Sequence, residues 1–312
     1  MNSCMVLIHP NEYSRRKKRP ITWVLAAMQR KHYLRFKRKE RQAARLTVMC
    51  NFMKQILSIL IGLLWTATVY AECAGTALWV FPSSQTIKQN TIFILDGYAE
   101  SQNVILGLNK KHDIYLKSGN KKVKLIVTGI YTGQFYLTQA LLKPETELVA
   151  GVEYTMFIDS LPEYDRFTRY NDKTKLYEPI KYKVVAGIDN DKPLLTSVPK
   201  EIDKSYIRFG CGPAMSVDFD FPVTDSSEVT IKTTVKNIKS RIETTYFIMP
   251  RNNQIIVGHG MCSGAFTFDE SNDYEVEFSF MDSSGNQTSW VGDRIKFTKP
   301  TDKNWDEWEK RK

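Results

Sequence analysis

Two acidic residues on one predicted strand are the first candidates for catalysis. Asp218 and Asp220 lie two positions apart in the alternating segment 217–221, so their carboxylates share one face of a strand. Glycosidases cleave sugar chains with paired carboxylates, and the acids of Asp269–Glu277 are the other candidates for such a hydrolase. The same alternation is typical of a strand with one solvated face, and this is the interpretation we prefer.

The segment from residue 162 to 183 is unusually rich in tyrosine and charge. Tyrosine and arginine are enriched at binding hot spots, and aromatic rings can also stack on sugars. The alternative is a long loop whose rings cover an edge strand, and both readings stay open. The C-terminal tryptophans are spaced i, i+3, which suits packing on the second domain or docking of a partner. The candidate binding surface comprises Tyr164, Phe167, Arg169, Tyr170, Tyr177, Trp305 and Trp308.

Recognised catalytic motifs are missing from the sequence. It has no phosphate loop, no GxSxG, no HExxH and no EF-hand loop. We therefore lean against an enzyme and expect no cofactor.

The basic charge of the chain is concentrated at its N-terminus. The chain has 312 residues, 44 of them basic and 34 acidic, for a net charge of +10. Residues 1–71 hold 14 of the basic residues and two of the acidic ones, which leaves 30 basic and 32 acidic residues in the remainder. The body of the chain thus carries about −2, so its charge gives no support to nucleic-acid binding.

A secretory signal peptide is predicted over residues 53–71. Lys54 precedes the apolar stretch 56–65, and Val69-Tyr70-Ala71 forms a V-x-A ending, with cleavage expected before Glu72. The apolar stretch is shorter than the ~20 residues of a membrane-spanning helix, although an uncleaved anchor is the competing reading. Residues 1–52 then form a basic leader, mis-annotated or disordered. We expect a secreted protein or one of the periplasm or cell envelope, which contacts the membrane only if this segment stays uncleaved.

Export favours disulfides among the cysteines that follow the leader. Cys211 and Cys262 lie in the same C-terminal region beside glycines, and we expect a bond between them. Cys73 is then left as a thiol, a bond between molecules or a lipid site. His259 with Cys211 and Cys262 could instead bind zinc or form a Cys–His pair, which the oxidising compartment disfavours.

The body of the chain has the pattern of an all-β protein. Short β-branched and aromatic runs alternate with Gly, Asn, Asp and Pro, and the turn at Gly119 reads as a hairpin. The turn-rich cluster 188–193 divides these runs into two sets of about 110 residues each, the size of a β-sandwich. We expect domains at 72–187 and 188–300 and a polar tail at 301–312.

Two segments give a resemblance to a known family. The segment 274–286 starts with Tyr274, alternates aromatic and acidic residues and ends in an Asp-x-x-Gly-Asn turn. Residues 148–159 repeat the design around Tyr154 and follow Leu142-Lys143-Pro144. Both resemble the penultimate strand of bacterial Ig-like (immunoglobulin-like) domains of secreted and surface proteins. The resemblance implies two tandem Ig-like β-sandwich domains in which this tyrosine ties the corner.

The junction between the expected domains is acidic. Asp189, Asn190 and Asp191 are similar to the calcium-coordinating linkers of cadherin-type tandem domains. Calcium needs six to eight oxygens, and three side chains supply only part of that shell, whereas the same residues are common in linkers. We expect no metal and keep these three residues as weak calcium candidates.

The sequence therefore predicts a non-enzymatic binding or scaffold protein built from Ig-like domains. Its expected partner is an unknown protein or polysaccharide of the cell surface. The alternative is a polysaccharide-acting hydrolase or an accessory carbohydrate-binding module of the envelope.

Overall fold

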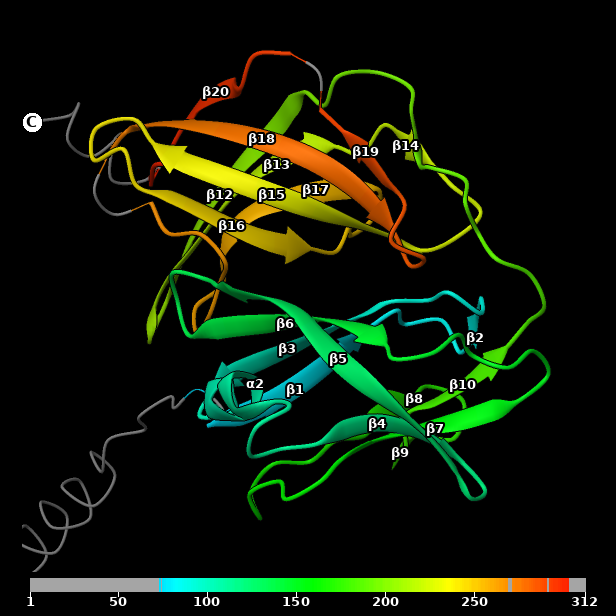
Figure 1. Ribbon diagram of the computed structural model, residues 1–312. Helices are drawn as coiled ribbons and strands as arrows, with labels where there is room; N and C mark the ends of the chain where they lie inside the picture. Colours follow the sequence, from blue (N-terminus) through cyan, green and yellow to red (C-terminus); the bar gives the residue numbers. More distant parts are fainter. Residues whose placement is uncertain (1–72, 74, 269–270, 291, 303–312) are drawn as a thin grey trace, which may run out of the picture. The chain divides into compact units, whose positions relative to one another are not determined.

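The computed structural model describes residues 73, 75–268, 271–290 and 292–302 (Figure 1). The leader, the predicted signal peptide and Trp305 and Trp308 lie outside these residues. The described chain is almost entirely β, which confirms the all-β class, and α2 (Gln102–Gly107) is its one short α-helix. None of the helices in the described part has the length and hydropathy needed to cross a membrane. We call residues 73–187 the N-terminal half and 188–302 the C-terminal half.

Eight strands of the N-terminal half form two sheets that share one strand, and β8 and β9 form a separate two-stranded sheet. The order of the eight strands is β1-β3-β6-β5-β4-β7-β10-β2. The twelve-residue β5 pairs with β4 through its first part and with β6 through its second, with a register shift between Val127 and Gly129. The shift lets one strand pass from one sheet to the other. The strands are β1 (Thr76–Phe81), β2 (Thr86–Ile87), β3 (Phe93–Ala99), β4 (Ile114–Ser118), β5 (Lys121–Thr132), β6 (Leu137–Pro144), β7 (Glu153–Ile158), β8 (Arg169–Asn171), β9 (Leu176–Glu178) and β10 (Lys181–Val184).

The two edge strands of this sheet system, β1 and β2, are its first two strands in sequence. The segment from β1 to β2 changes sheets, because β1 pairs antiparallel with β3 whereas β2 pairs parallel with β10. β1 therefore borders one sheet and β2 the other. The expected hairpin at Gly119 is present, with φ of 53° at that glycine between β4 and β5.

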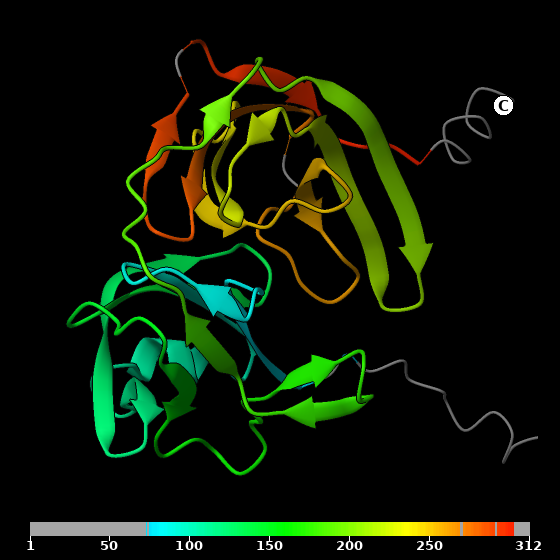
Figure 2. The ribbon, with the colours of Figure 1, turned by 90° about the vertical axis from the view of Figure 1, so that its right-hand side faces the viewer.

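The C-terminal half has two facing sheets and a two-stranded ribbon, β11-β14. One sheet has the order β12-β13-β17, and the other has β16-β15-β18-β19 with β20 also paired to β18. Figure 2 shows the long β12–β13 hairpin in yellow-green. The strands are β11 (Leu194–Leu195), β12 (Glu201–Phe209), β13 (Gly212–Asp220), β14 (Val223–Thr224), β15 (Val229–Asn237), β16 (Glu243–Ile248), β17 (Gln254–His259), β18 (Asp273–Asp282), β19 (Gln287–Ser289) and β20 (Ile295–Thr298).

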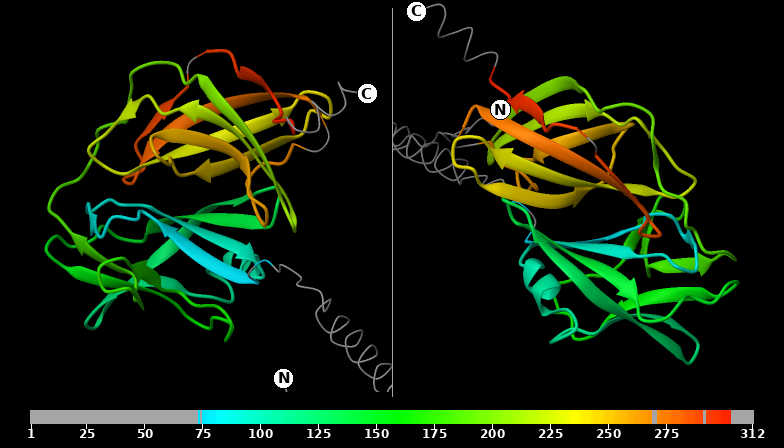
Figure 3. Two further views of the ribbon diagram at one scale, coloured as in Figure 1. Left: turned by 180° about the vertical axis from the view of Figure 1, so that it is seen from behind. Right: turned by 45° about the horizontal axis from the view of Figure 1, so that its top comes forward.

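Each half buries a core of its own between its sheets, as the strand layers in Figure 3 suggest. Tyr154 is fully buried in the N-terminal core, and its hydroxyl accepts a hydrogen bond from the Val149 backbone N–H at 3.4 Å. Tyr274 is buried at the same place in the C-terminal half and stacks on Phe297 at 5.6 Å. The alternation predicted for β18 is confirmed, with Val276, Phe278 and Phe280 fully buried and the intervening residues partly exposed.

Some predicted strands differ from the structure. Residues 264–268 form no strand, although Gly264 makes isolated bridges to Phe135 and His259. The expected strand at 184–187 lies earlier, as β10, where it pairs with β7. The stretch from 162 to 183, expected to be a polar connection, contains β8, β9 and most of β10.

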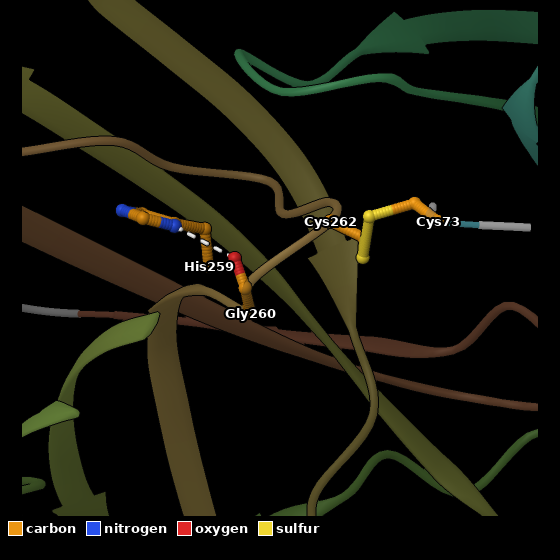
Figure 4. The surroundings of a disulfide bond; sticks show 4 residues. All are labelled: Cys73, His259, Gly260 and Cys262. Carbon is orange, nitrogen blue, oxygen red and sulfur yellow. Dashed lines mark hydrogen bonds between the residues drawn. A yellow bond between two sulfur atoms is a disulfide. The ribbon is translucent and has the colours of Figure 1, made fainter. Parts of the chain in front are cut away.

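The predicted disulfide between Cys211 and Cys262 is wrong. Cys262 is bonded to Cys73, 189 positions away, with 5.7 Å between their Cα atoms (Figure 4). The physical reason is the docking of the loop after β17. Phe135 and Gly264 exchange backbone hydrogen bonds, which holds this loop against the N-terminal half near the start of β1. Cys211 is exposed at the turn of the β12–β13 hairpin.

Candidate functional site

A groove of about 540 Å³ runs along the outer edge of β1. One wall is the strand itself, from Thr76 to Val80, and the other comes from the segment 164–180. Four aromatic side chains on the groove are exposed to solvent, with exposed fractions of 51% for Trp79, 58% for Tyr164, 45% for Tyr170 and 72% for Tyr177. We call this feature the tyrosine groove.

A short hairpin positions two of these rings. β8 and β9 pair antiparallel, and Tyr170 lies opposite Tyr177 in the register. Directly opposed residues on antiparallel strands have neighbouring side chains. Their ring centroids are 5.3 Å apart, edge to face. The hairpin, whose backbone is drawn in green in Figure 2, thus presents a preformed aromatic pair beside β1.

Arg169 joins the hairpin to the end of β1. Its guanidinium donates to the carbonyl oxygens of Ser83 at 2.7 Å, Pro82 at 3.0 Å and Val80 at 3.3 Å. It also donates to the Tyr182 hydroxyl at 3.0 Å, and burial raises the pKa of that phenol to about 12. The donors of Arg169 are therefore engaged by the protein, which makes this residue a support of the groove.

The other predicted residues either support the groove or lie on its surface. Phe167 is partly buried against the N-terminal core, so its ring anchors the segment. Tyr164 lies on the groove, and its carbonyl oxygen accepts a hydrogen bond from the Thr76 hydroxyl at 3.4 Å. The structure thus brings Tyr164, Tyr170 and Tyr177 together.

Trp79 and Arg166 are groove residues that sequence reasoning missed. Trp79 lies in β1, where alternation turns Leu78 into the core and leaves the indole outside. Arg166 is exposed on the opposite wall. Alternation marks Trp79 as outward-facing, but only the fold places it beside tyrosines about 90 positions later in the chain.

The outer edge of β1 turns backbone groups toward the groove. The Val80 carbonyl faces Arg169, away from β3, whereas the Gly75 carbonyl accepts from Glu100 N–H on the β3 side. Residues alternate in direction along a strand edge, so the backbone N–H and C=O groups of Thr76 and Leu78 also face outward. Among the described residues no hydrogen-bond partner for these backbone groups is present on that side.

The acidic junction is built differently from the sequence expectation. Asp189 approaches Asp225 and Asp282, with one carboxylate oxygen of each within 4.8 Å of the others. Asn190 and Asp191 have exposed side chains, and Asp191 only donates its N–H to Asp189. Burial raises the pKa of Asp282, and the charge of Asp189 adds to the shift.

Hydrogen-bond donors already reach these junction carboxylates. Ser227 donates its hydroxyl to Asp189 and its N–H to Asp225. Asn286 donates its amide to Asp282 at 2.8 Å. The three carboxylates are the described residues that could hold a cation, although calcium needs six to eight oxygens.

The zinc and Cys–His hypotheses fail because Cys262 is in a disulfide. The Nδ1 atom of His259 lies 2.9 Å from the Gly260 carbonyl oxygen, as Figure 4 shows. A disulfide sulfur is neither a thiolate ligand nor a nucleophile.

Asp218 and Asp220, the strand carboxylates of the hydrolase hypothesis, occupy positions that the strand pattern of β13 explains. Asp218 and Asp220 alternate with the buried residues of β13, as expected for the outer side of a sheet. Asp220 accepts the Lys200 backbone N–H, which ties β13 to the start of β12. Residues 269 and 270 lie outside the described part of the chain.

No protein-family model and no curated protein matches this chain. Among solved structures, it is similar to a type I pullulanase from Bacillus subtilis complexed with maltose (10% identity, TM-score 0.21, 73% of this chain and 25% of that chain). A pullulanase from Anoxybacillus sp. complexed with maltotriose matches at 8% identity and TM-score 0.20, over 67% of this chain and 24% of that chain. A DUF3823 family protein from Bacteroides ovatus matches at 7% identity and TM-score 0.17, over 72% of this chain and 98% of that chain. The chain spans about a quarter of the pullulanases, and likeness at these scores carries no argument about its fold or activity.

Proposed function

We propose that this protein is a non-enzymatic, secreted or envelope-associated binding protein that holds a polysaccharide chain in the tyrosine groove. The observation that carries the proposal is the set of four exposed aromatic rings along one groove. Exposed aromatics are costly in water unless a ligand covers them, and sugar rings offer apolar faces of matching size. The groove volume of about 540 Å³ lies within the range of small-ligand sites.

The scaffold supports this role. The order β1-β3-β6-β5 against β4-β7-β10 has the arrangement of the two sheets of an immunoglobulin sandwich. The tyrosine hydroxyl of Tyr154, bonded to backbone upstream, supports the same assignment. We therefore infer Ig-like domains at 72–187 and 188–300. Recognition in such folds is carried by sites added to the scaffold.

The disulfide supports an oxidising compartment. The bond between Cys73 and Cys262 begins just after the expected cleavage site, so a chain cleaved before Glu72 would keep it. Disulfides persist in secreted and envelope proteins and are rare in the cytosol. Export through residues 53–71 thus remains our proposal for the leader.

A binding role is favoured over hydrolysis. Among the residues that the structure describes, none that lines the tyrosine groove is acidic, whereas glycoside hydrolysis uses two carboxylates that flank the scissile bond. The hydrolase candidates Asp218 and Asp220 lie on β13 of the other half. An accessory carbohydrate-binding role fits the groove without a reaction.

The test is calorimetric titration of the full chain with a panel of neutral oligosaccharides. We expect at least one to bind, and Tyr177→Ala to weaken that binding by about tenfold because a stacking face is lost. The matched control is Leu176→Ala, which alters a neighbouring exposed side chain of the same hairpin that does not line the groove. Equal losses in both variants, or no binding by the parent chain, would refute the groove as the site.

A further inference from the structure

We propose that a second cavity, lined by residues of both halves, binds a small organic ammonium ion with an apolar body and pairs its charge with Asp96. This cavity has a volume of about 560 Å³ and is lined by residues of β1, β3, β13, β16 and β17, among others. Asp96 does not line the tyrosine groove. The inference therefore goes beyond the proposed function and does not depend on it.

The strand register places Trp79, Asp96 and Gln139 side by side. Trp79 pairs with Asp96 across β1 and β3, and Asp96 pairs with Gln139 across β3 and β6. Directly opposed residues of antiparallel strands carry neighbouring side chains on one face. Gln139 is fully buried and exchanges hydrogen bonds with the Phe247 backbone of β16, whereas Trp79 is 51% exposed. β16 thus covers one end of this row, and the cavity lies at the end that holds Asp96 and Trp79.

Asp96 carries a charge that no described basic residue balances. Its Oδ1 atom accepts from the Tyr246 hydroxyl at 2.6 Å and from the Gln139 amide at 2.8 Å, and both donors are neutral. None of the ion pairs in the described part of the chain includes Asp96. Burial raises the pKa of this carboxyl to about 6, so above that pH a desolvated carboxylate lines the cavity. A cationic group is the partner that such a carboxylate favours most.

The remaining walls of the cavity are mainly apolar. Trp79 supplies an aromatic ring beside the carboxylate, and such rings attract both cations and apolar groups. Four further apolar side chains line the cavity, namely Ile207, Met215, Met249 and Ile256. The site therefore combines one carboxylate with an aromatic and an aliphatic surface, which matches an ammonium group attached to an apolar body.

Other classes of ligand fit this cavity less well. A divalent metal needs several oxygen ligands, and Asp96 is the one carboxylate among the described residues of the lining. An anion would be repelled by Asp96, and a neutral sugar or hydrocarbon would leave the desolvated charge unpaired. Arg251 and His259 are the basic residues of the lining, and the charge of Arg251 disfavours a ligand with a second positive charge. A monoamine satisfies all of these conditions.

The experiment is calorimetric titration of the full chain at about pH 8 with tryptamine and with indole-3-ethanol. The two probes share the indole and its side chain, but only tryptamine carries an ammonium group. We expect tryptamine to bind about tenfold more tightly, because its ammonium forms a charge-assisted hydrogen bond with Asp96. Equal affinities of the two probes, or no binding of tryptamine, would overturn the proposal.

The variant Asp96→Asn tests the ionic contact, because an Asn oxygen can still accept from Tyr246 and Gln139. We expect its affinity for tryptamine to fall about tenfold, to the level of indole-3-ethanol. The matched control is Asp172→Asn, which makes the same change at a side chain that is 91% exposed and does not line the cavity. Equal losses in both variants would assign the binding to general charge and overturn the site. Tyr177→Ala should also bind tryptamine like the parent chain, and a loss there would place the amine in the tyrosine groove and refute this cavity.

Discussion

The Tyr246 hydroxyl donates a hydrogen bond of 2.6 Å to the Asp96 carboxylate across the two halves of the protein. The same oxygen accepts from Gln139 at 2.8 Å, and Gln139 also pairs with the Phe247 backbone in both directions. Asp96 lies on β3 and Tyr246 on β16, so this network joins the two sheet systems. Burial outweighs the two donated hydrogen bonds and raises the pKa of Asp96 from 3.8 to about 6.

The raised pKa predicts a pH-dependent stability. The folded state holds the Asp96 proton more tightly than the unfolded chain, so this carboxyl favours folding most below its unfolded pKa near 3.8. The contribution is lost as the pH rises through the folded pKa of about 6. The loss is at most about 3 kcal/mol, since Asp96 keeps partial solvent access. Denaturant unfolding across this pH range measures it.

The variant Asp96→Asn isolates this residue. An Asn oxygen can accept from both Tyr246 and Gln139 without the cost of a buried charge. We expect the variant to be more stable than the parent above about pH 7, by up to about 3 kcal/mol, and to lose the pH-dependent component assigned to Asp96. A variant that is less stable at that pH would show that the ionised carboxylate is the favoured form.

Local patterns were sufficient to predict most of the strands. Alternation along β18 and the tyrosines at 154 and 274 are properties of single segments, so the sequence carries them directly. The segment 264–268 is also largely apolar, but it forms no strand. Its backbone hydrogen bonds instead dock a loop on Phe135. Tertiary contacts override strand propensity at such a place.

The sites depended on pairings distant in sequence. The tyrosine-rich segment was recognisable by composition, yet its partner Trp79 lies on another strand. Asp225 and Asp282 likewise approach Asp189 in space, although they lie 36 and 93 residues after it in the sequence. Sequence alone also gave no way to choose Cys73 over Cys211 as the partner of Cys262.

The acidic junction yields a prediction about calcium. Asp189 and Asp282 already accept hydrogen bonds from protein donors, and the described part of the chain brings three carboxylates together there. We expect the melting temperature to be the same with calcium and with a chelator, and Asp225→Asn to stabilise the protein by about 1 kcal/mol through reduced repulsion. Differential scanning fluorimetry measures both. A rise in melting temperature with calcium that Asp225→Asn removes would instead identify a calcium site.

The disulfide yields a prediction about the free energy of unfolding. Cys73–Cys262 closes a loop with a sequence separation of 189, for which the chain-entropy model gives about 5 kcal/mol. We expect Cys73→Ser to lower the free energy of unfolding by a large part of this amount in denaturant titrations. Non-reducing peptide mapping of the parent chain should recover a peptide pair containing Cys73 and Cys262.

The matched control for this variant is Cys211→Ser. It removes a sulfur from an exposed turn and leaves the Cys73–Cys262 bond in place, so stability should change by less than about 0.5 kcal/mol. Mapping that joins Cys211 to Cys262 would contradict the structure. If the pairing is confirmed but Cys73→Ser unfolds like the parent chain, the docking contacts of Phe135 and Gln139 hold the halves together without the bond.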